Sequence, residues 1–260
     1  MNALIWKRRL GKIFNSKNSG KRDVILNYHS IEGGSLSLSK KNFYEQIAWL
    51  KDNAKVITLD EILNEPNHGD LRVVLSFDDG YHTLFTNVQP ILSASGFPAI
   101  VYVNSGLLGE DTHLPSVQEL GHYPDEFFLR WEEVSFLAQC GWIIGAHGVD
   151  HVDLTKTSAN ETYNQLTECK KSIESKLGIP CSHFAYTWGR YNYHVQLAVK
   201  SIGFYSAAAC LHGPITKFSN RFALPRVDIR ADYELHDFID VVTGHWDYIG
   251  FKHRLERMFI

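Results

Sequence analysis

Residues 73–80 read Val73-Val74-Leu75-Ser76-Phe77-Asp78-Asp79-Gly80, an apolar run closed by two carboxylates and a glycine. Four of the first five residues are apolar types that favour strands, so the run predicts a strand that is buried on both faces. Two neighbouring carboxylates at the end of such a strand lose solvation and repel each other unless a cation or strong donors meet them. The alternative is a tight Asp-Gly turn whose acids are solvated or cap the next helix.

The rest of the chain alternates apolar strand-like runs with helical patterns. Such alternation predicts an α/β protein with a mostly parallel sheet of seven or eight strands, and it favours closure into one (β/α) barrel over an open doubly wound sheet. The predicted strands are 24–28, 56–59, 73–77, 99–103, 142–146, 183–186, 204–209 and 223–229. The predicted helices are 41–53, 81–95, 131–140, 159–177, 191–202 and 232–242.

Length and composition agree with a globular single domain. A chain of 260 residues with 44% hydrophobic content can bury a sizeable core. The four cysteines are far apart and include no C-x-x-C pair, which indicates buried free thiols rather than disulfides or a cysteine metal site. No apolar run approaches the ~18 residues of a transmembrane helix, so the chain is not expected to span a bilayer.

Charge divides the chain into a basic segment 1–22 and the predicted barrel 23–260. The segment holds seven Lys or Arg and no acid, which leaves 19 basic against 29 acidic residues, a net charge of -10, in the remainder. An acidic barrel repels phosphates, so nucleic acid is not an expected partner. We expect a basic amphipathic helix at the start, suited to an anionic membrane surface; the alternative is that it packs on the domain.

The apolar run before Lys7 is too short for a secretory signal. We therefore expect a cytoplasmic protein that contacts the inner face of the membrane peripherally. The stretch 106–128 lacks periodicity and is expected to be a loop or insertion that faces the substrate. Its two imidazoles, His113 and His122, are interpreted as solvated side chains.

Polar residues follow five of the predicted strands. Because a barrel builds its active site at the carboxyl ends of its strands, these side chains are expected to converge on one rim. The residues that end or follow the strands are His29, Asp78, Asp79, Asn104, His147, Thr187, Trp188 and Gly189.

His147 and His151 are four residues apart, with Gly148 directly after the predicted strand. An extended chain would hold their α-carbons ~13 Å apart, whereas a compact loop brings both within reach of one ion. With a carboxylate from the acidic pair, two imidazoles form the three-ligand set of a catalytic zinc site.

These motifs together resemble a known family. Residues 76–80 are similar to the (T/S)FDDG motif of the polysaccharide deacetylases, the NodB-homology or carbohydrate esterase family 4 group. Residues 147–151 resemble the second motif of that family, and residues 184–192 (FAYTWGRYN) resemble the third. Segments 27–31 and 224–228 look like parts of a subgroup with an N-terminal Tyr-His segment. The resemblance spans about residues 23–230 and implies a distorted (β/α) barrel.

The resemblance implies a metal site and a set of catalytic residues. Asp79, His147 and His151 would hold a divalent metal ion, zinc in most relatives. Asp78 would be the general base, a role worth ~10²–10⁴-fold in rate. The backbone N–H of Trp188 would donate to the oxyanion. The general acid would be His29, since no convincing copy of the usual C-terminal histidine motif is present.

Two departures from the third motif bear on the base. Ala185 stands where many relatives carry the arginine that orients the base, and Thr187 replaces a proline. Arg226 is the candidate that compensates from another strand, since a guanidinium offers the fork that a carboxylate accepts; Arg190 is the second choice. An ordinary ion pair at a barrel end is the alternative for Arg226. Tyr186, Trp188 and Asn104 are the candidate substrate-binding residues.

The predicted activity is metal-dependent removal of an N-acetyl group from an N-acetylated carbohydrate of a glycan or a lipid-linked glycan intermediate. A deformylase or an O-acetyl esterase would use the same site, because the barrel and the metal do not define the acyl group. A third hypothesis is a catalytically inactive glycan-binding protein that retains the metal, motivated by Ala185 and the missing C-terminal motif.

Overall fold

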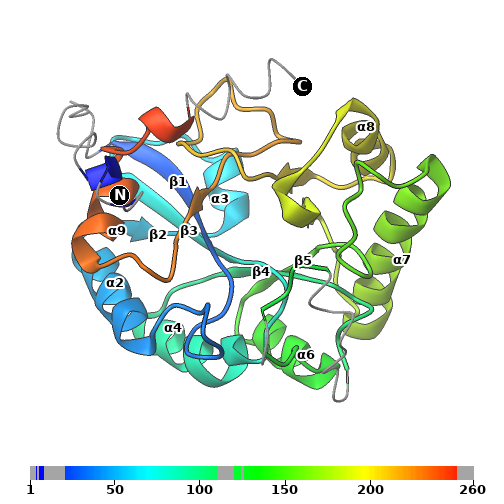
Figure 1. Ribbon diagram of the computed structural model, residues 1–260, viewed down its shortest axis with the longest axis horizontal. Coiled ribbons are helices and arrows are strands. Elements are labelled where there is room, and N and C mark those ends of the chain that lie inside the picture. The colour runs from blue at the N-terminus through cyan, green and yellow to red at the C-terminus, as the bar shows by residue number, and fades with distance from the viewer. Residues whose placement is uncertain (1–3, 5, 9–20, 110–119, 124–125, 251–260) are drawn as a thin grey trace.

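The computed structural model describes residues 4, 6–8, 21–109, 120–123 and 126–250. In these residues, eight parallel strands form one curled sheet, a half-barrel with helices around its outer face (Figure 1). The strand order is β7-β6-β5-β4-β3-β1-β8, and β2 pairs with β3 beside this path. The strands are β1 (Arg22–Tyr28), β2 (Lys55–Val56), β3 (Leu71–Phe77), β4 (Ile100–Val103), β5 (Ile143–Ala146), β6 (His183–Ala185), β7 (Ser206–Ala208) and β8 (Val227–Asp228).

The predicted alternation of strands and helices is confirmed, but six of the eight strands are shorter than predicted, most of all at 56–59, 204–209 and 223–229. Predicted strand 56–59 ends at Val56 because Thr58 caps the next helix and accepts a hydrogen bond from the Glu61 backbone N–H. Pro225 has no N–H to donate, and β8 begins only at Val227. The helices and turns are α2 (Lys40–Asn53), α3 (Leu59–Asn64), η1 (Leu84–Val88), α4 (Gln89–Ser95), α6 (Trp131–Gln139), α7 (Ala159–Leu177), η2 (Thr187–Gly189), α8 (Tyr193–Ser201) and α9 (Leu235–Thr243).

The central strands align the carboxyl edge of the sheet. β1 and β3 pair in parallel over seven residues, and every residue of β3 is buried. β3 thus has the continuous apolar character of a strand covered on both faces. Because all strands point the same way, His29, Asp78, Asn104 and His147 leave β1, β3, β4 and β5 at one edge of the sheet.

The inner face of the sheet holds its own small core. Large and small side chains alternate there: Tyr102 packs over Gly145, where an added Cβ would lie 2.5 Å from the tyrosine ring. Ala185 and Ala208 are fully buried in the same cluster. The small residues leave space for the guanidinium of Arg226, whose central carbon lies 5.6 Å from the centre of the Tyr102 ring.

The basic N-terminal segment falls mostly outside the described residues, as do three apolar positions of its predicted helix, Leu10, Ile13 and Phe14, whereas Trp6 is described and is exposed. Its described part contacts the domain: Arg8 donates two hydrogen bonds to the buried carboxylate of Asp237, at 2.7 and 2.6 Å. Lys7 donates to the hydroxyl of Tyr233 at 3.3 Å. Among the described helices, none combines the length and apolar character needed to cross a bilayer.

The four cysteines are all free, in agreement with the prediction that they form no disulfides. Cys169 and Cys181 are buried, as expected, whereas Cys140 and Cys210 are exposed. The expectation of buried thiols was therefore wrong for these two, because Cys140 caps the end of α6 and Cys210 lies just beyond β7.

Candidate metal centre

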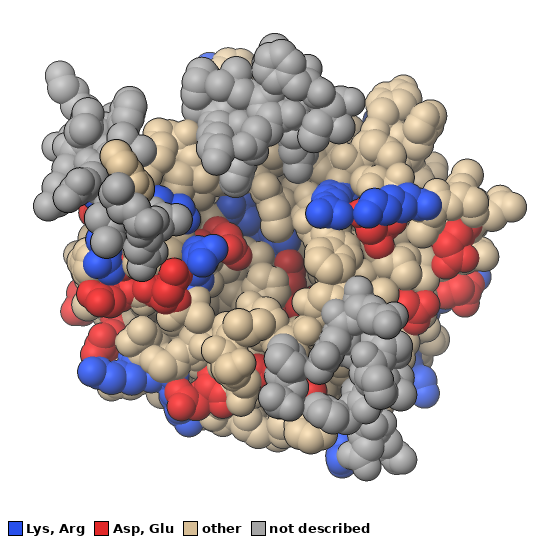
Figure 2. Space-filling view, viewed as in Figure 1, with Lys and Arg blue, Asp and Glu red and all other residues tan. Residues whose placement is uncertain are grey.

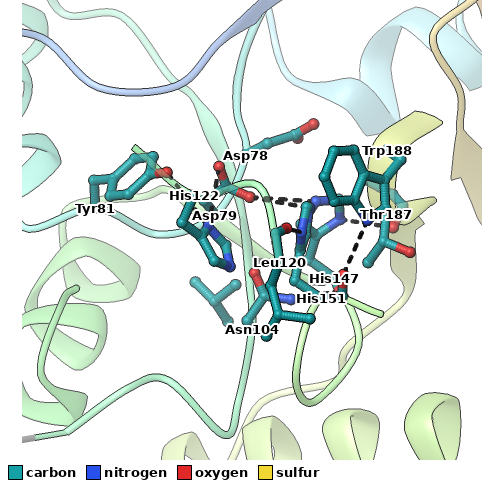
Figure 3. A network of polar contacts seen from close by, with 12 residues as sticks. Asp78, Asp79, Tyr81, Asn104, Leu120, His122, His147, His151, Thr187 and Trp188 are labelled. Atoms are coloured by element: carbon teal, nitrogen blue, oxygen red, sulfur yellow. Dashed lines mark hydrogen bonds and ion pairs between the residues drawn. The ribbon is translucent and has the colours of Figure 1, made fainter. Parts of the chain in front are cut away.

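Three potential metal ligands meet at the carboxyl edge of the sheet. The Oδ1 atom of Asp79 lies 3.5 Å from Nε2 of His147 and 3.4 Å from Nε2 of His151 (Figure 3). Donor atoms at ~2.1 Å from a tetrahedral ion lie ~3.4 Å from one another, so these separations fit one divalent ion. All three residues are buried, and within the described part of the chain Asp79 Oδ1 has no hydrogen-bond partner. The donor set therefore fits a metal ion.

The backbone presents these ligands in tight turns. Asp79 has φ 71°, a left-handed conformation that turns its carboxylate back toward β5 directly after Asp78 leaves β3. His147 follows β5, and Gly148 (φ 82°) and His151 (φ 60°) complete a compact loop. The H-x-x-x-H spacing thus brings both imidazoles to one point, as expected from the sequence.

Backbone carbonyls orient both imidazoles. Nδ1 of His147 lies 2.8 Å from the carbonyl oxygen of Ala185, and Nδ1 of His151 lies 2.7 Å from that of Leu120. A carbonyl only accepts, so each Nδ1 carries the proton and each Nε2 lone pair faces Asp79. Burial lowers the pKa of both histidines, that of His151 to about 4, and so favours the neutral form that binds metal.

Asp78 forms a buried ion pair beside the metal ligands. The guanidinium of Arg226 donates to both carboxylate oxygens, at 2.6 and 2.7 Å, and also to the side-chain oxygen of Asn27 at 2.7 Å. Burial alone would raise the pKa of Asp78, but the charge of the Arg226 guanidinium beside it holds that pKa below its usual range. Asp78 is therefore a buried carboxylate that stays ionised and able to accept a proton. The second candidate, Arg190, instead binds Asp153 at 2.7 Å on the surface.

An Arg226→Lys variant is expected to lower the free energy of unfolding by about 1.5–3 kcal/mol, because an ammonium cannot make both bonds to Asp78. Denaturant unfolding measures the loss, and kcat is expected to fall with it. The matched control is Arg190→Lys, whose exposed pair with Asp153 should cost less than about 1 kcal/mol. Equal stability of the two variants would show that the two hydrogen bonds from Arg226 to Asp78 stabilise the fold no more than an exposed ion pair does.

His29 and Trp188 flank the metal ligands. His29 is close enough for its charge to lower the pKa of both Asp78 and Asp79, and its ring stacks on Tyr123 with centres 5.8 Å apart. Trp188 has φ 59°, is 42% exposed, and donates from its indole to the carbonyl of His151 at 3.2 Å. Both residues thus lie where a substrate could reach them.

The face that carries the site is hollowed near its centre, with charged side chains around the hollow (Figure 2). A cavity of roughly 400 Å³ on the molecular surface adjoins His29, and Tyr123, Asp228, Arg230 and Asp232 also line it. A wall of aromatic and charged groups of this kind suits a polar ligand such as a sugar.

Two of the predicted substrate-binding residues are buried beneath the loops of the site. Asn104 and Tyr186 are fully buried. The amide of Asn104 donates to the carbonyl of His147 at 2.6 Å, and the hydroxyl of Tyr186 donates to that of Phe222 at 2.9 Å. Because each side chain donates a hydrogen bond to a backbone carbonyl, both residues support the loops of the site.

His122 was also misinterpreted from the sequence. It is buried rather than solvated, with Nδ1 3.6 Å from Oδ2 of Asp79 and 3.3 Å from the hydroxyl of Tyr81 (Figure 3). His113 lies outside the described residues. The only signal for His122 was its metal-competent residue type, because the stretch 106–128 carries no periodicity from which to infer burial.

A parallel half-barrel with a carboxylate pair and two histidines at its carboxyl edge fits a metal-dependent hydrolase. The polysaccharide deacetylase family model matches residues 65–207, more than half of the chain. The chain therefore belongs to the polysaccharide deacetylase family, hydrolases of carbon–nitrogen bonds other than peptide bonds.

Two curated relatives cover most of the chain. The YxkH protein of Bacillus subtilis is 26% identical over 211 residues, which are 79% of this chain and 70% of that protein. The poly-beta-1,6-N-acetyl-D-glucosamine N-deacetylase of Staphylococcus aureus (strain MRSA252) is 25% identical over 224 residues, 81% of this chain and 72% of that enzyme.

Solved structures share the fold. IcaB from Ammonifex degensii matches with a TM-score of 0.74 and 18% identity, over 86% of this chain and 98% of its own. The Streptococcus pyogenes deacetylase PplD, in complex with acetate, matches with a TM-score of 0.72 and 20% identity, over 86% of this chain and 99% of its own.

Proposed function

We propose that this protein is a metal-dependent deacetylase that removes the N-acetyl group of an N-acetylated aminosugar in a glycan or a lipid-linked glycan intermediate. The observation that carries the proposal is the buried Asp78–Arg226 pair directly beside the Asp79, His147 and His151 cluster. This arrangement supports the assignment of an ionised base beside a metal site. The resemblance to a poly-beta-1,6-N-acetyl-D-glucosamine N-deacetylase supports a polymer of N-acetylglucosamine as the substrate.

Each residue of the site has a separate role in the proposed reaction. A divalent ion held by the cluster would polarise the amide carbonyl and lower the pKa of water. Asp78 accepts the proton of the attacking water. Arg226 donates to both oxygens of Asp78, which keeps this carboxylate ionised and fixes its orientation. The backbone N–H of Trp188 donates to the oxyanion that forms at the carbonyl. His29 then gives a proton to the leaving nitrogen as the carbon–nitrogen bond breaks, which yields acetate and a free amine.

Arg226 also bears on the hypothesis of an inactive binding protein. That hypothesis drew on Ala185, which lacks the guanidinium of the third motif. In the structure Arg226 supplies a bidentate guanidinium to Asp78 from the segment before β8. The base therefore has a partner, and this favours catalysis over binding alone.

The proposal is tested with short N-acetylglucosamine oligomers, by measuring acetate and formate after incubation with the purified protein and by determining its metal content. We expect acetate release that stops after chelation and returns when Zn²⁺ is added. The matched substrates are the N-formylated and O-acetylated analogues. Release of acyl groups only from these would move the assignment to a deformylase or an esterase, and bound metal without any release would indicate a binding protein.

A further inference from the structure

Residues Leu120–Tyr123 contact two of the three potential metal ligands, His151 and Asp79. The carbonyl of Leu120 accepts from His151, and Tyr123 stacks on Tyr81 and His29, with ring centres 5.5 and 5.8 Å apart. A Cβ added at Gly121 would lie only 2.1 Å from the ring of Trp188, so this segment packs tightly on the site. The stretch was expected to face the substrate, but these residues also contact the potential ligands His151 and Asp79.

His122 is the member of this segment that reaches the metal ligand Asp79. Its side chain is fully buried, edge-on to Phe128 and with its ring centre 4.5 Å from that of His151. Burying an imidazole costs free energy unless its polar atoms find partners. In the described part of the molecule Nδ1 has such partners in Tyr81 and Asp79, whereas Nε2 has none.

The two oxygens of Asp79 have separate environments. Oδ1 faces the Nε2 atoms of His147 and His151, and Oδ2 faces Nδ1 of His122 at 3.6 Å (Figure 3). An ionised carboxylate only accepts hydrogen bonds, so this contact is favourable when Nδ1 of His122 carries the proton. In that tautomer Nε2 of His122 carries a lone pair and no proton. Nε2 is also the ring atom for which the described residues offer no partner. Tyr81 is held in place as well, because its hydroxyl accepts from the backbone N–H of Tyr123 at 2.8 Å.

We propose that His122 is a positioning residue of the metal site, which holds the non-ligating oxygen of Asp79 so that Oδ1 points at the ion. The proposal rests on the metal-dependent function proposed above. Outer partners of this kind commonly change metal affinity ~10–100-fold. The backbone carbonyl of Leu120 orients the imidazole of His151 by accepting a hydrogen bond from Nδ1. The segment Leu120–Tyr123 therefore supports two of the three ligands.

The test compares zinc affinity in three variants of the full chain. His122→Phe keeps a ring but removes the donor, whereas His122→Asn places an amide N–H near the position of Nδ1. The matched control is His183→Phe, which removes another buried imidazole near a carboxylate, Asp60, at the opposite end of the sheet. Competition with a chromophoric chelator gives the zinc dissociation constants, and the visible spectrum of the cobalt form reports the ligand geometry.

We expect His122→Phe to raise the zinc dissociation constant ~10–100-fold and alter the cobalt spectrum, His122→Asn to restore both, and His183→Phe to match the wild type. Thermal midpoints of the metal-free proteins separate these effects from unfolding. Wild-type affinity in His122→Phe, or equal weakening in His122→Asn, would overturn the role of His122. A wild-type protein that takes up no zinc would instead overturn the metal site itself.

Discussion

The His147→Ala variant is expected to purify without a metal ion and to release no acetate above the uncatalysed background. His147 supplies one of three buried donors, and its Nε2 lies 3.5 Å from Oδ1 of Asp79. Without it, only Asp79 and His151 remain as protein ligands, fewer than a catalytic zinc site requires. Lewis-acid catalysis contributes several kcal/mol, so the rate should fall by ~10³-fold or more.

Metal analysis by mass spectrometry and an acetate assay measure both effects. The matched control is His194→Ala, which removes an exposed histidine at the start of α8 and should retain metal and activity. If His147→Ala kept a full equivalent of metal with unchanged turnover, the ligand assignment would be wrong. Loss of metal with unchanged turnover would show instead that the reaction does not depend on the metal.

The Asp78→Asn variant is expected to keep its metal and to lose ~10²–10⁴-fold in kcat. The amide has nearly the same size as the carboxylate but cannot accept the proton of the attacking water. The metal ligands are separate residues, so metal content should be unchanged. The variant is also expected to be less stable by about 3–5 kcal/mol, because Arg226 is left as a buried charge without its counterion.

Asp23→Asn separates the catalytic effect from the stability effect. Asp23 accepts two hydrogen bonds from the buried guanidinium of Arg72, at 2.8 and 2.7 Å, at the amino-terminal end of β1, away from the metal ligands. This variant should lose stability without losing kcat at metal saturation. An Asp78→Asn protein that turned over as fast as the wild type would refute the assignment of Asp78 as the base.

The strand ends could be predicted from the sequence because their signals are local. Apolar runs followed by polar residues indicate where buried strands leave the sheet, and parallel pairing then brings those ends together. His147 and His151 needed only the compact loop that Gly148 permits. The sequence was thus sufficient to predict that the three possible metal ligands lie together at one edge of the sheet.

The contacts that depend on side-chain direction were not accessible in this way. Asn104 and Tyr186 follow strands as the other site residues do, but their side chains turn toward backbone carbonyls. His122 lies in a stretch without periodicity, and its burial follows from packing against Phe128 and Tyr81. The Asp78–Arg226 pair joins residues 148 positions apart. The sequence suggested this pair only because a guanidinium can donate to both oxygens of a carboxylate.

The buried guanidinium of Arg226 has a consequence for how such sites evolve. The base needs a positive charge at one point inside the barrel, but that point can be reached from more than one strand. Ala185, which stands at the position that corresponds by resemblance to the arginine of the third motif, is fully buried in this interior. An exchange of the arginine between strands that passes through a form with neither would leave Asp78 unpaired. That form costs several kcal/mol, and such an exchange should be rare enough to mark a lineage.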